Sequence, residues 1–426
     1  MNTIPTTEDD DLVLIADAYG QSRLLQRRMV CNRANNWLDI WFQLPKDVLV
    51  SRYRSMIAAG NERLRTQLGS SAGERGISAQ IVFAAGKRCA PNQPHTIACY
   101  PLPDSPVDSD IYGANTDTIM GWNKYSSHKQ RYLNSGYIIG PIGHVKKMFV
   151  KAWAMAESIP EHDPNDNGSH GSDFLYHGSD QSIFNILFGI QEYRRASLET
   201  KAFFIRGKKS SPRARASTIE GTVISDRTNP SFTHEKLGRE PWADDELGLM
   251  LDYYSELGHQ TVNSERDARF VVYADALDKQ VSTDRGMFDC ASQLSPSLPE
   301  DVLSAEMPLA RINASFPDAA VPGWKDVPLY AHLCLDQIPV MIHHNGDKSA
   351  REHSWQSLWL QRYGKELLEA KSLALSHTAA VIVGGDESGD SVMTQKTIIA
   401  RTDKGQSLEW KDLCSAEMEG EIFGHP

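Results

Sequence analysis

Three short apolar runs constrain the fold of this chain more than any other feature. Residues 12–17, "LVLIAD", are apolar up to a carboxylate, and residues 80–85, "QIVFAA", are nearly as apolar. Residues 131–143, "RYLNSGYIIGPIG", form the third run, with Asn and Gly at a place where the chain can turn. Runs without polar alternation predict strands that are covered on both faces, as in a parallel sheet. We therefore expect a parallel strand at residues 12–17.

Helical patterns lie between these runs. Apolar residues recur at helical spacing over residues 143–157, and a second helix begins at Asp180, which can serve as its N-cap. Residues 328–348 return to a core pattern in which a strand ends at His343, and a further helix follows from Ser354. Strands alternating with helices predict an α/β layered fold, with a mixed, mostly parallel sheet and flanking helices.

Composition excludes several classes of protein. The 426 residues carry a net charge of −11 with a pI near 5.7, which argues against a nucleic-acid-binding protein. No run of about 18 apolar residues occurs, so we expect no membrane span. The acidic, polar start "MNTIPTTEDDD" argues against a signal peptide.

Cysteine spacing and glycosylation sequons give weaker indications. No C-x-x-C pair occurs, which argues against a structural zinc site. Cys89 and Cys99 flank a short turn at a spacing that a disulfide can bridge. Asn167 and Asn313 lie in N-x-S/T sequons, and together these features are compatible with a secretory history.

An acidic motif at the end of the first run is interrupted. Asp17 and Asp39 are separated by the basic run 20–38, which lacks apolar periodicity. Without that run, the two carboxylates form a compact D-x-x-D at a strand end, where open α/β sheets bind their ligands. Such a pair suits Mg²⁺ or Mn²⁺ bridging a diphosphate. The alternative is a strand-capping Asp beside an unrelated loop Asp.

The joined segment, D-A-Y-D-I-W-F-Q-L-P, resembles the glycosyltransferase domain of the lysyl hydroxylase/procollagen glucosyltransferase family, most closely its fungal stand-alone members. The resemblance covers about residues 12–375. Further matching segments, in chain order, are "FAAGKRCAPN" (83–92), "ACYPLPDSP" (98–106), "YGANTD" (112–117), "RYLNSGYIIGP" (131–141), "DQSIFNILF" (180–188), "LGLMLDYYSELGHQTVNSERDARFV" (247–271) and "IHHNGDK" (342–348).

This resemblance implies a GT-A-like fold and a set of site residues. They are the metal ligands Asp17, Asp39 and His343, the donor-binding residues Tyr19, Asn134, Ser135, Gly136, Asn345, Gly346 and Lys348, and the catalytic residues Asp180 and Gln181. The implied cofactor is Mn²⁺, and the implied donor substrate is a UDP-sugar. His344 is not a ligand, because adjacent side chains of a strand point to opposite faces.

Several of these residues have a purely structural interpretation as well. Asn134 to Gly136 fit a tight turn, and Asp180 fits a helix cap. We expect Lys87 and Arg88 to be solvated rather than to bind a sugar nucleotide. Asp252 and His259 lie in a matching segment without an identified role.

The family pattern also suggests how the chain is divided. Residues 1–19 would be the start of a glycosyltransferase domain that lacks its N-terminal nucleotide-binding elements, and residues 39–376 would be the remainder. Residues 20–38 would be an insertion outside the fold, either a translated, unspliced intron or a surface loop. Residues 377–426 would be a partly disordered extension.

The expected activity is metal-dependent transfer of a hexose from a UDP-sugar to a protein or glycan acceptor in the ER or Golgi lumen. The main alternative is a truncated protein of the same fold without catalysis. A metal hydrolase that uses Asp17, Asp180 and His343 is a third hypothesis.

Overall fold

A computed structural model describes most of the chain between residues 10 and 367. The described residues are 10–16, 39–92, 94, 96–109, 111–113, 116, 124–158, 179–205, 217–219, 222–224, 246–282, 290, 292–311, 322–347, 350–367, 398–401, 407–409, 420 and 423. The predicted insertion 20–38 and nearly all of the extension 377–426 lie outside these residues.

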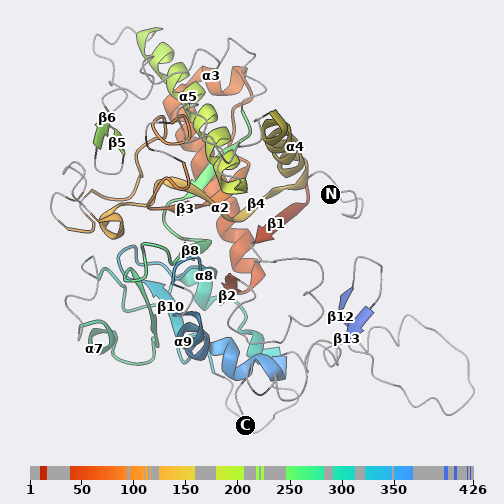
Figure 1. Ribbon diagram of the computed structural model, residues 1–426. Helices are drawn as coiled ribbons and strands as arrows, with labels where there is room; N and C mark the ends of the chain where they lie inside the picture. The colour runs from red at the N-terminus through yellow and green to blue at the C-terminus, as the bar shows by residue number, and fades with distance from the viewer. Residues whose placement is uncertain are drawn as a thin grey trace, which may run out of the picture.

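The structure alternates strands and helices along the chain (Figure 1). The strands are β1 (Leu12–Ala16), β2 (Ile40–Phe42), β3 (Ile81–Gly86), β4 (Tyr132–Pro141), β5 (Ser217–Ile219), β6 (Thr222–Ile224), β7 (Leu249–Asp252), β8 (Gly258–Gln260), β9 (Ala268–Val271), β10 (Leu329–His332), β11 (Met341–His343), β12 (Ile398–Arg401) and β13 (Ser407–Glu409). The helices are α2 (Lys46–Leu68), α3 (Ser70–Glu74), α4 (Ile142–Ser158), α5 (Asp180–Ile205), α7 (Leu277–Ser282), α8 (Glu300–Leu303) and α9 (Ala350–Ser357), with 359–367 also helical.

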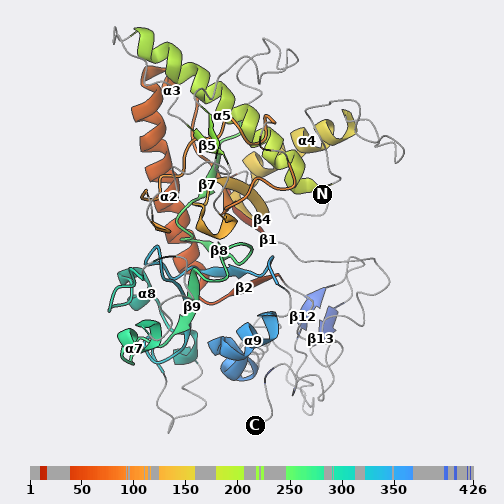
Figure 2. The same ribbon diagram turned by 60° about the vertical axis from the view of Figure 1, so that its left-hand side comes forward.

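The main sheet has the strand order β1-β4-β3-β7 and is covered on both faces (Figure 2). On β3, Ile81 and Phe83 belong to the apolar cluster that contains α4 and α5. Val82 and Ala84, which alternate with them, belong to the cluster that contains α2. Because consecutive side chains of a strand point to opposite faces, an all-apolar β3 is what two helical layers require.

The sheet is mixed, and the prediction of a mostly parallel sheet is wrong for the described strands. β4 runs antiparallel to both β1 and β3, and only β3 and β7 are parallel within this sheet. Residues 12–16 therefore form an antiparallel strand rather than the parallel one expected. β1 is also an edge strand with exposed ends and a half-buried middle, so the two-sided burial that its apolar run predicts is found in β3 and not in β1.

A second, smaller sheet lies beneath the first in Figure 1. In it, β11 pairs antiparallel with β2 and parallel with β8, and the β9–β10 pair lies nearby. Its apolar residues Met341 and Ile342 belong to the same cluster as Leu49 and Tyr53 of α2. One long helix thus contributes to the cores beneath both sheets.

Most predicted elements are confirmed, with adjusted ends. The helix expected at 143–157 is α4, and the strand expected to end at His343 is β11. Asp180 lies inside the first turn of α5 rather than at its N-cap, since the amides of Ser182 and Ile183 donate to the carbonyl of Ser179. A carboxylate in the first turn still complements the helix dipole.

The Cys89–Cys99 disulfide is present, and the loop that it closes lies on the start of α5. Asn185 donates to Asn92, and Asn92 donates to Ser182, so the loop is anchored by polar contacts. Gly189 permits the close approach, because an added Cβ there would lie 1.8 Å from the carbonyl oxygen of Ile97.

The described helices include none that is both long and apolar enough to cross a membrane. In the extension, Phe423 packs on the helix 359–367, where an added Cβ at Gly364 would lie 2.7 Å from its ring. At least this residue of the extension is in contact with the folded body.

We predict that Gly189→Ala destabilises the protein by about 2 kcal/mol, because the new methyl must displace the disulfide loop from α5. Urea unfolding measures this difference. Gly73→Ala is the control, since an added Cβ at Gly73 meets nothing within 4 Å. Equal stabilities of the two variants would contradict the packing described here.

Candidate functional site

The two sheets meet where His343 lies against the bulged part of β4 that begins at Asn134. The prediction of a tight turn at Asn134 to Gly136 is wrong, because these residues continue the strand through a bulge. A Cβ added to Gly136 would lie 2.0 Å from Cε1 and 2.2 Å from Nδ1 of His343. Glycine is therefore required at position 136 for the imidazole to occupy its place. Two sequence-predicted site residues, distant in the chain, are brought into direct contact.

The end of β1 points to the same place. Ala16, its last residue, pairs with Tyr137, the neighbour of Gly136. Asp17 follows Ala16 directly in the chain. Asp17, Tyr19 and Lys348 themselves lie outside the described residues, so their predicted roles remain predictions.

Asn134 and Gln181 brace each other beside this contact. Asn134 donates through Nδ2 to Oε1 of Gln181 at 2.8 Å, and its own Oδ1 accepts from the Gly136 amide at 2.8 Å. The Ser135 amide also donates to Oε1 of Gln181, and Nε2 of Gln181 donates to the carbonyl of Ala90. Both ends of the Gln181 amide are therefore engaged, which is typical of a positioning residue rather than of a catalytic one. Asp180, next to it, is exposed at the start of α5.

Asp39 and His343 are not brought together as two ligands of one ion. The strand register pairs His343 with Ile40, and the amide of His344 donates to the carbonyl of Asp39. Since side chains alternate, Asp39 lies on the His344 side of the ladder. Its carboxylate is buried and bonded to Arg351 of α9, which also donates to the carbonyl of His344.

Asn345 and Gly346, which follow His343 in the predicted donor-binding motif, form hydrogen bonds with the end of β8 and the loop after it. Asn345 accepts from the Val262 amide at 3.0 Å and donates to Oε1 of Gln260 at 3.2 Å. Gly346 donates to the Thr261 hydroxyl at 3.1 Å, and an added Cβ there would lie 2.7 Å from a Glu265 oxygen. Gln260 was not predicted as a site residue. Its position at the carboxyl end of a short strand is a signal that could have found it.

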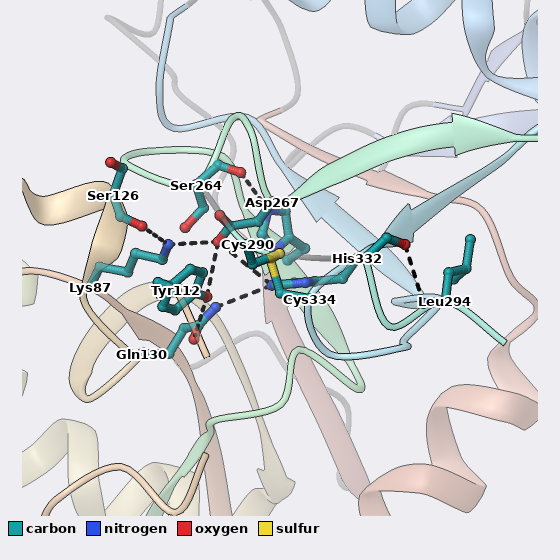
Figure 3. Close-up of a disulfide and its surroundings, with 12 residues drawn as sticks. Lys87, Tyr112, Ser126, Gln130, Ser264, Asp267, Cys290, Leu294, His332 and Cys334 are labelled. Atoms are coloured by element: carbon teal, nitrogen blue, oxygen red, sulfur yellow. Dashed lines mark hydrogen bonds and ion pairs between the residues drawn. A yellow bond between two sulfur atoms is a disulfide. The ribbon is translucent and has the colours of Figure 1, made fainter. Parts of the chain in front are cut away.

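A buried charge network ties the end of β3 in the main sheet to the start of the β9–β10 pair (Figure 3). Lys87, directly after β3, is 1% exposed and lies 2.7 Å from a carboxylate oxygen of Asp267, which is fully buried. Tyr112 donates to the same oxygen at 3.1 Å, and Ser126 accepts from Lys87 through its carbonyl. The prediction that Lys87 is solvated is wrong, because a tertiary partner from a distant segment compensates its desolvation. Arg88 is exposed, as expected.

Two neutral histidines border this network. Burial lowers the pKa of His259 to about 3, and burial together with His259 and Lys87 lowers the pKa of His332 well below its usual value. His332 lies 3.8 Å from Asp267, and its ring lies 4.8 Å from that of His259. These side chains are structural, and so is the Cys290–Cys334 disulfide beside them, which we did not predict.

Asp252 also has a structural role. Its carboxylate accepts from the amides of Glu256 and Leu257 at 2.8 Å each, from the Gly258 amide at 3.1 Å and from the Tyr137 hydroxyl at 2.8 Å. These four donors hold the turn between β7 and β8. Burial outweighs the donors and raises the pKa of Asp252.

No family model matches this chain, and no curated protein matches it either.

We predict that His259 and His332 lower the stability as the pH drops below about 6.5, while the raised pKa of Asp252 acts in the opposite direction and offsets part of the loss. The unfolded chain binds protons at both histidines in that range, whereas the folded protein keeps them neutral until the pH approaches the lowered folded pKa values, about 3 for His259. At pH 5 each histidine should cost about 2 kcal/mol relative to neutral pH. Urea unfolding at pH 7.5 and pH 5 measures this loss.

His259→Gln should reduce the loss by about 2 kcal/mol, because one of the two groups is removed. His353→Gln is the matched control, since His353 is exposed on α9. An unchanged pH dependence in His259→Gln would refute the assignment.

Proposed function

We propose that this protein is a glycosyltransferase that moves a hexose from a UDP-sugar to a protein or glycan acceptor. The observation that carries the proposal is the contact of His343 with Gly136. It joins the "LNSG" and "IHHNGDK" segments, which the family resemblance implicates independently in the donor site. The end of β1 and the start of α5 adjoin the same bulge of β4.

In the proposed reaction, the bond between the anomeric carbon and the diphosphate breaks, and an acceptor oxygen bonds to that carbon and loses its proton. Asp180 is exposed and carries a carboxylate that can orient the acceptor hydroxyl or stabilise positive charge on the sugar. Gln181 and Asn134 act indirectly, by fixing the bulge of β4 from Asn134 to Gly136 against α5.

Manganese is part of the proposal through His343 and Asp17. A bound Mn²⁺ would offset the charge that builds on the departing diphosphate. An imidazole with carboxylates is an acceptable donor set for this ion. Asp39 fits it poorly, because its carboxylate is bonded to Arg351 on the other side of the β2–β11 ladder.

The ion pair between Asp39 and Arg351 favours a second candidate function, that of a protein of this fold without metal-dependent catalysis. In that case the Asp39–Arg351 pair would serve only to fix α9 to the second sheet. The two candidates differ in a property that is simple to measure, the binding of UDP-sugar.

A secretory compartment is part of the same proposal. The disulfides Cys89–Cys99 and Cys290–Cys334 support it, since such bonds persist mainly in oxidising compartments.

We predict that the protein binds UDP-glucose or UDP-galactose in the presence of MnCl₂ and releases UDP from one of them. Gly136→Ala should lower the rate of UDP release by about 100-fold, because its methyl group displaces His343 from the donor site. Gly73→Ala should leave the rate unchanged. Calorimetric binding and UDP release are to be measured on the full chain and on a version that lacks residues 20–38. If neither version binds either nucleotide sugar, the non-catalytic candidate is correct.

A further inference from the structure

We propose that Gln260 is a donor-binding residue whose side-chain amide donates a hydrogen bond to a hydroxyl oxygen of the hexose. This inference rests on the proposed function and adds a residue that the family resemblance did not supply. Asn345, which the resemblance did supply, becomes the residue that positions Gln260.

The strand register places Gln260 beside His343. β8 and β11 are parallel, and Gln260 and His343 are partners at the carboxyl ends of the two strands. Partners in a parallel ladder point to the same face of a sheet, so Gln260 shares the face on which His343 meets Gly136. Ligands of open α/β sheets bind at this edge. The Gln260 side chain also lies close to the end of β3, since a Cβ added to Gly86 would be 3.4 Å from Oε1 of Gln260.

Hydrogen bonds fix which way the Gln260 amide points. The backbone amide of Val262 can only donate, so the atom of Asn345 that faces it must be Oδ1. The amino group of Asn345 therefore faces Gln260 and requires an oxygen there, which identifies Oε1. The amino group of Gln260 must point away from Asn345.

That amino group is buried and has no hydrogen-bond partner among the residues that the structure describes. Two other buried glutamines, Gln43 and Gln191, differ in this respect. Gln43 donates to the carbonyls of Tyr330 and Pro339, and Gln191 donates to that of Leu249. Leaving such a donor unpaired costs about 1–3 kcal/mol, a cost that a ligand oxygen would remove. Gln260 alone in this group is therefore arranged to receive a ligand.

The chemistry of the amide favours a hydroxyl over a phosphate. The Gln260 amide is neutral, its oxygen already accepts from Asn345, and its unpaired group is the amino group, which donates. A diphosphate is recognised best by charged donors, and Lys348 is the family's match for that role. The hexose is therefore the part of the donor that we assign to Gln260.

The experiment compares UDP with UDP-hexose on the full chain. Calorimetric titrations with UDP, UDP-glucose and UDP-galactose, each with MnCl₂, are made on the wild type, Gln260→Met and Gln260→Glu. Both variants lack the amino group, and Gln260→Glu keeps the oxygen that Asn345 needs. We expect the dissociation constant of the bound UDP-hexose to rise about fivefold in Gln260→Met, in line with one lost hydrogen bond, and that of UDP to stay unchanged.

Gln356→Met is the matched control, since Gln356 is exposed on α9 and should bind as the wild type does. Thermal unfolding without ligand measures the structural effect of the substitution. Gln260→Met also removes the oxygen that accepts from Asn345, so it should lower the melting temperature slightly. The binding role is therefore given by the affinity for the UDP-hexose relative to that for UDP, because a general disturbance of the site would weaken both.

Three outcomes overturn the inference. Unchanged affinity of Gln260→Met for the UDP-hexose would remove Gln260 from the donor site, while the proposed function would stand. An equal loss for UDP would move the contact to the nucleotide or the diphosphate. If the wild type binds none of the three ligands, the proposed function fails and the assignment of Gln260 fails with it.

Discussion

The buried ion pair between Lys87 and Asp267 is the interaction on which the placement of the β9–β10 pair against the main sheet depends. Lys87 follows the central strand of the main sheet, and Asp267 precedes β9 beside the second sheet. Removing one partner of a buried pair leaves an uncompensated charge, at a cost of about 3–5 kcal/mol, so the two segments must stay together. Tyr112 and the neutral His332 complete the surroundings of the carboxylate without adding charge. The candidate site lies at the same junction, formed by the ends of β1, β4, β8 and β11.

The contact between His343 and Gly136 at this junction is the structural basis of the proposed function. His343 can occupy its position only because Gly136 has no side chain, and Gly136 is fixed by the brace between Asn134 and Gln181. The disulfide loop holds that brace from the other side, through the carbonyl of Ala90. Gln181, which was predicted as catalytic, thus holds the site in shape. Among the described residues, the groups that we propose contact the substrate are the carboxylate of Asp180 at the surface and the amino group of Gln260 in the interior.

Sequence patterns identified the elements that have a regular period. β3, β4, α4 and α5 were expected from apolar runs and helical spacing, and the Cys89–Cys99 disulfide from a short turn. The 23-residue helix α2 was missed, because charged residues interrupt its apolar spacing and one of them, Arg52, is buried against Asp301 and two carbonyls. The Cys290–Cys334 disulfide was missed as well, since a separation of 44 residues carries no local signal.

By itself the sequence determined the layered α/β class and the apolar strands β3 and β4 at the centre of the main sheet. It also identified the polar segments around Asn134 and His343 that the fold brings together. These follow from local period and from residue chemistry, which do not depend on distant partners. Only the tertiary structure decided the direction of β1, the burial of Lys87, the pairing of Asp39 with Arg351 and the orientation of Gln260. Each of these four features depends on a partner residue far away in the chain. The partner's charge or hydrogen bonds determine whether the side chain is buried, paired or available to a ligand.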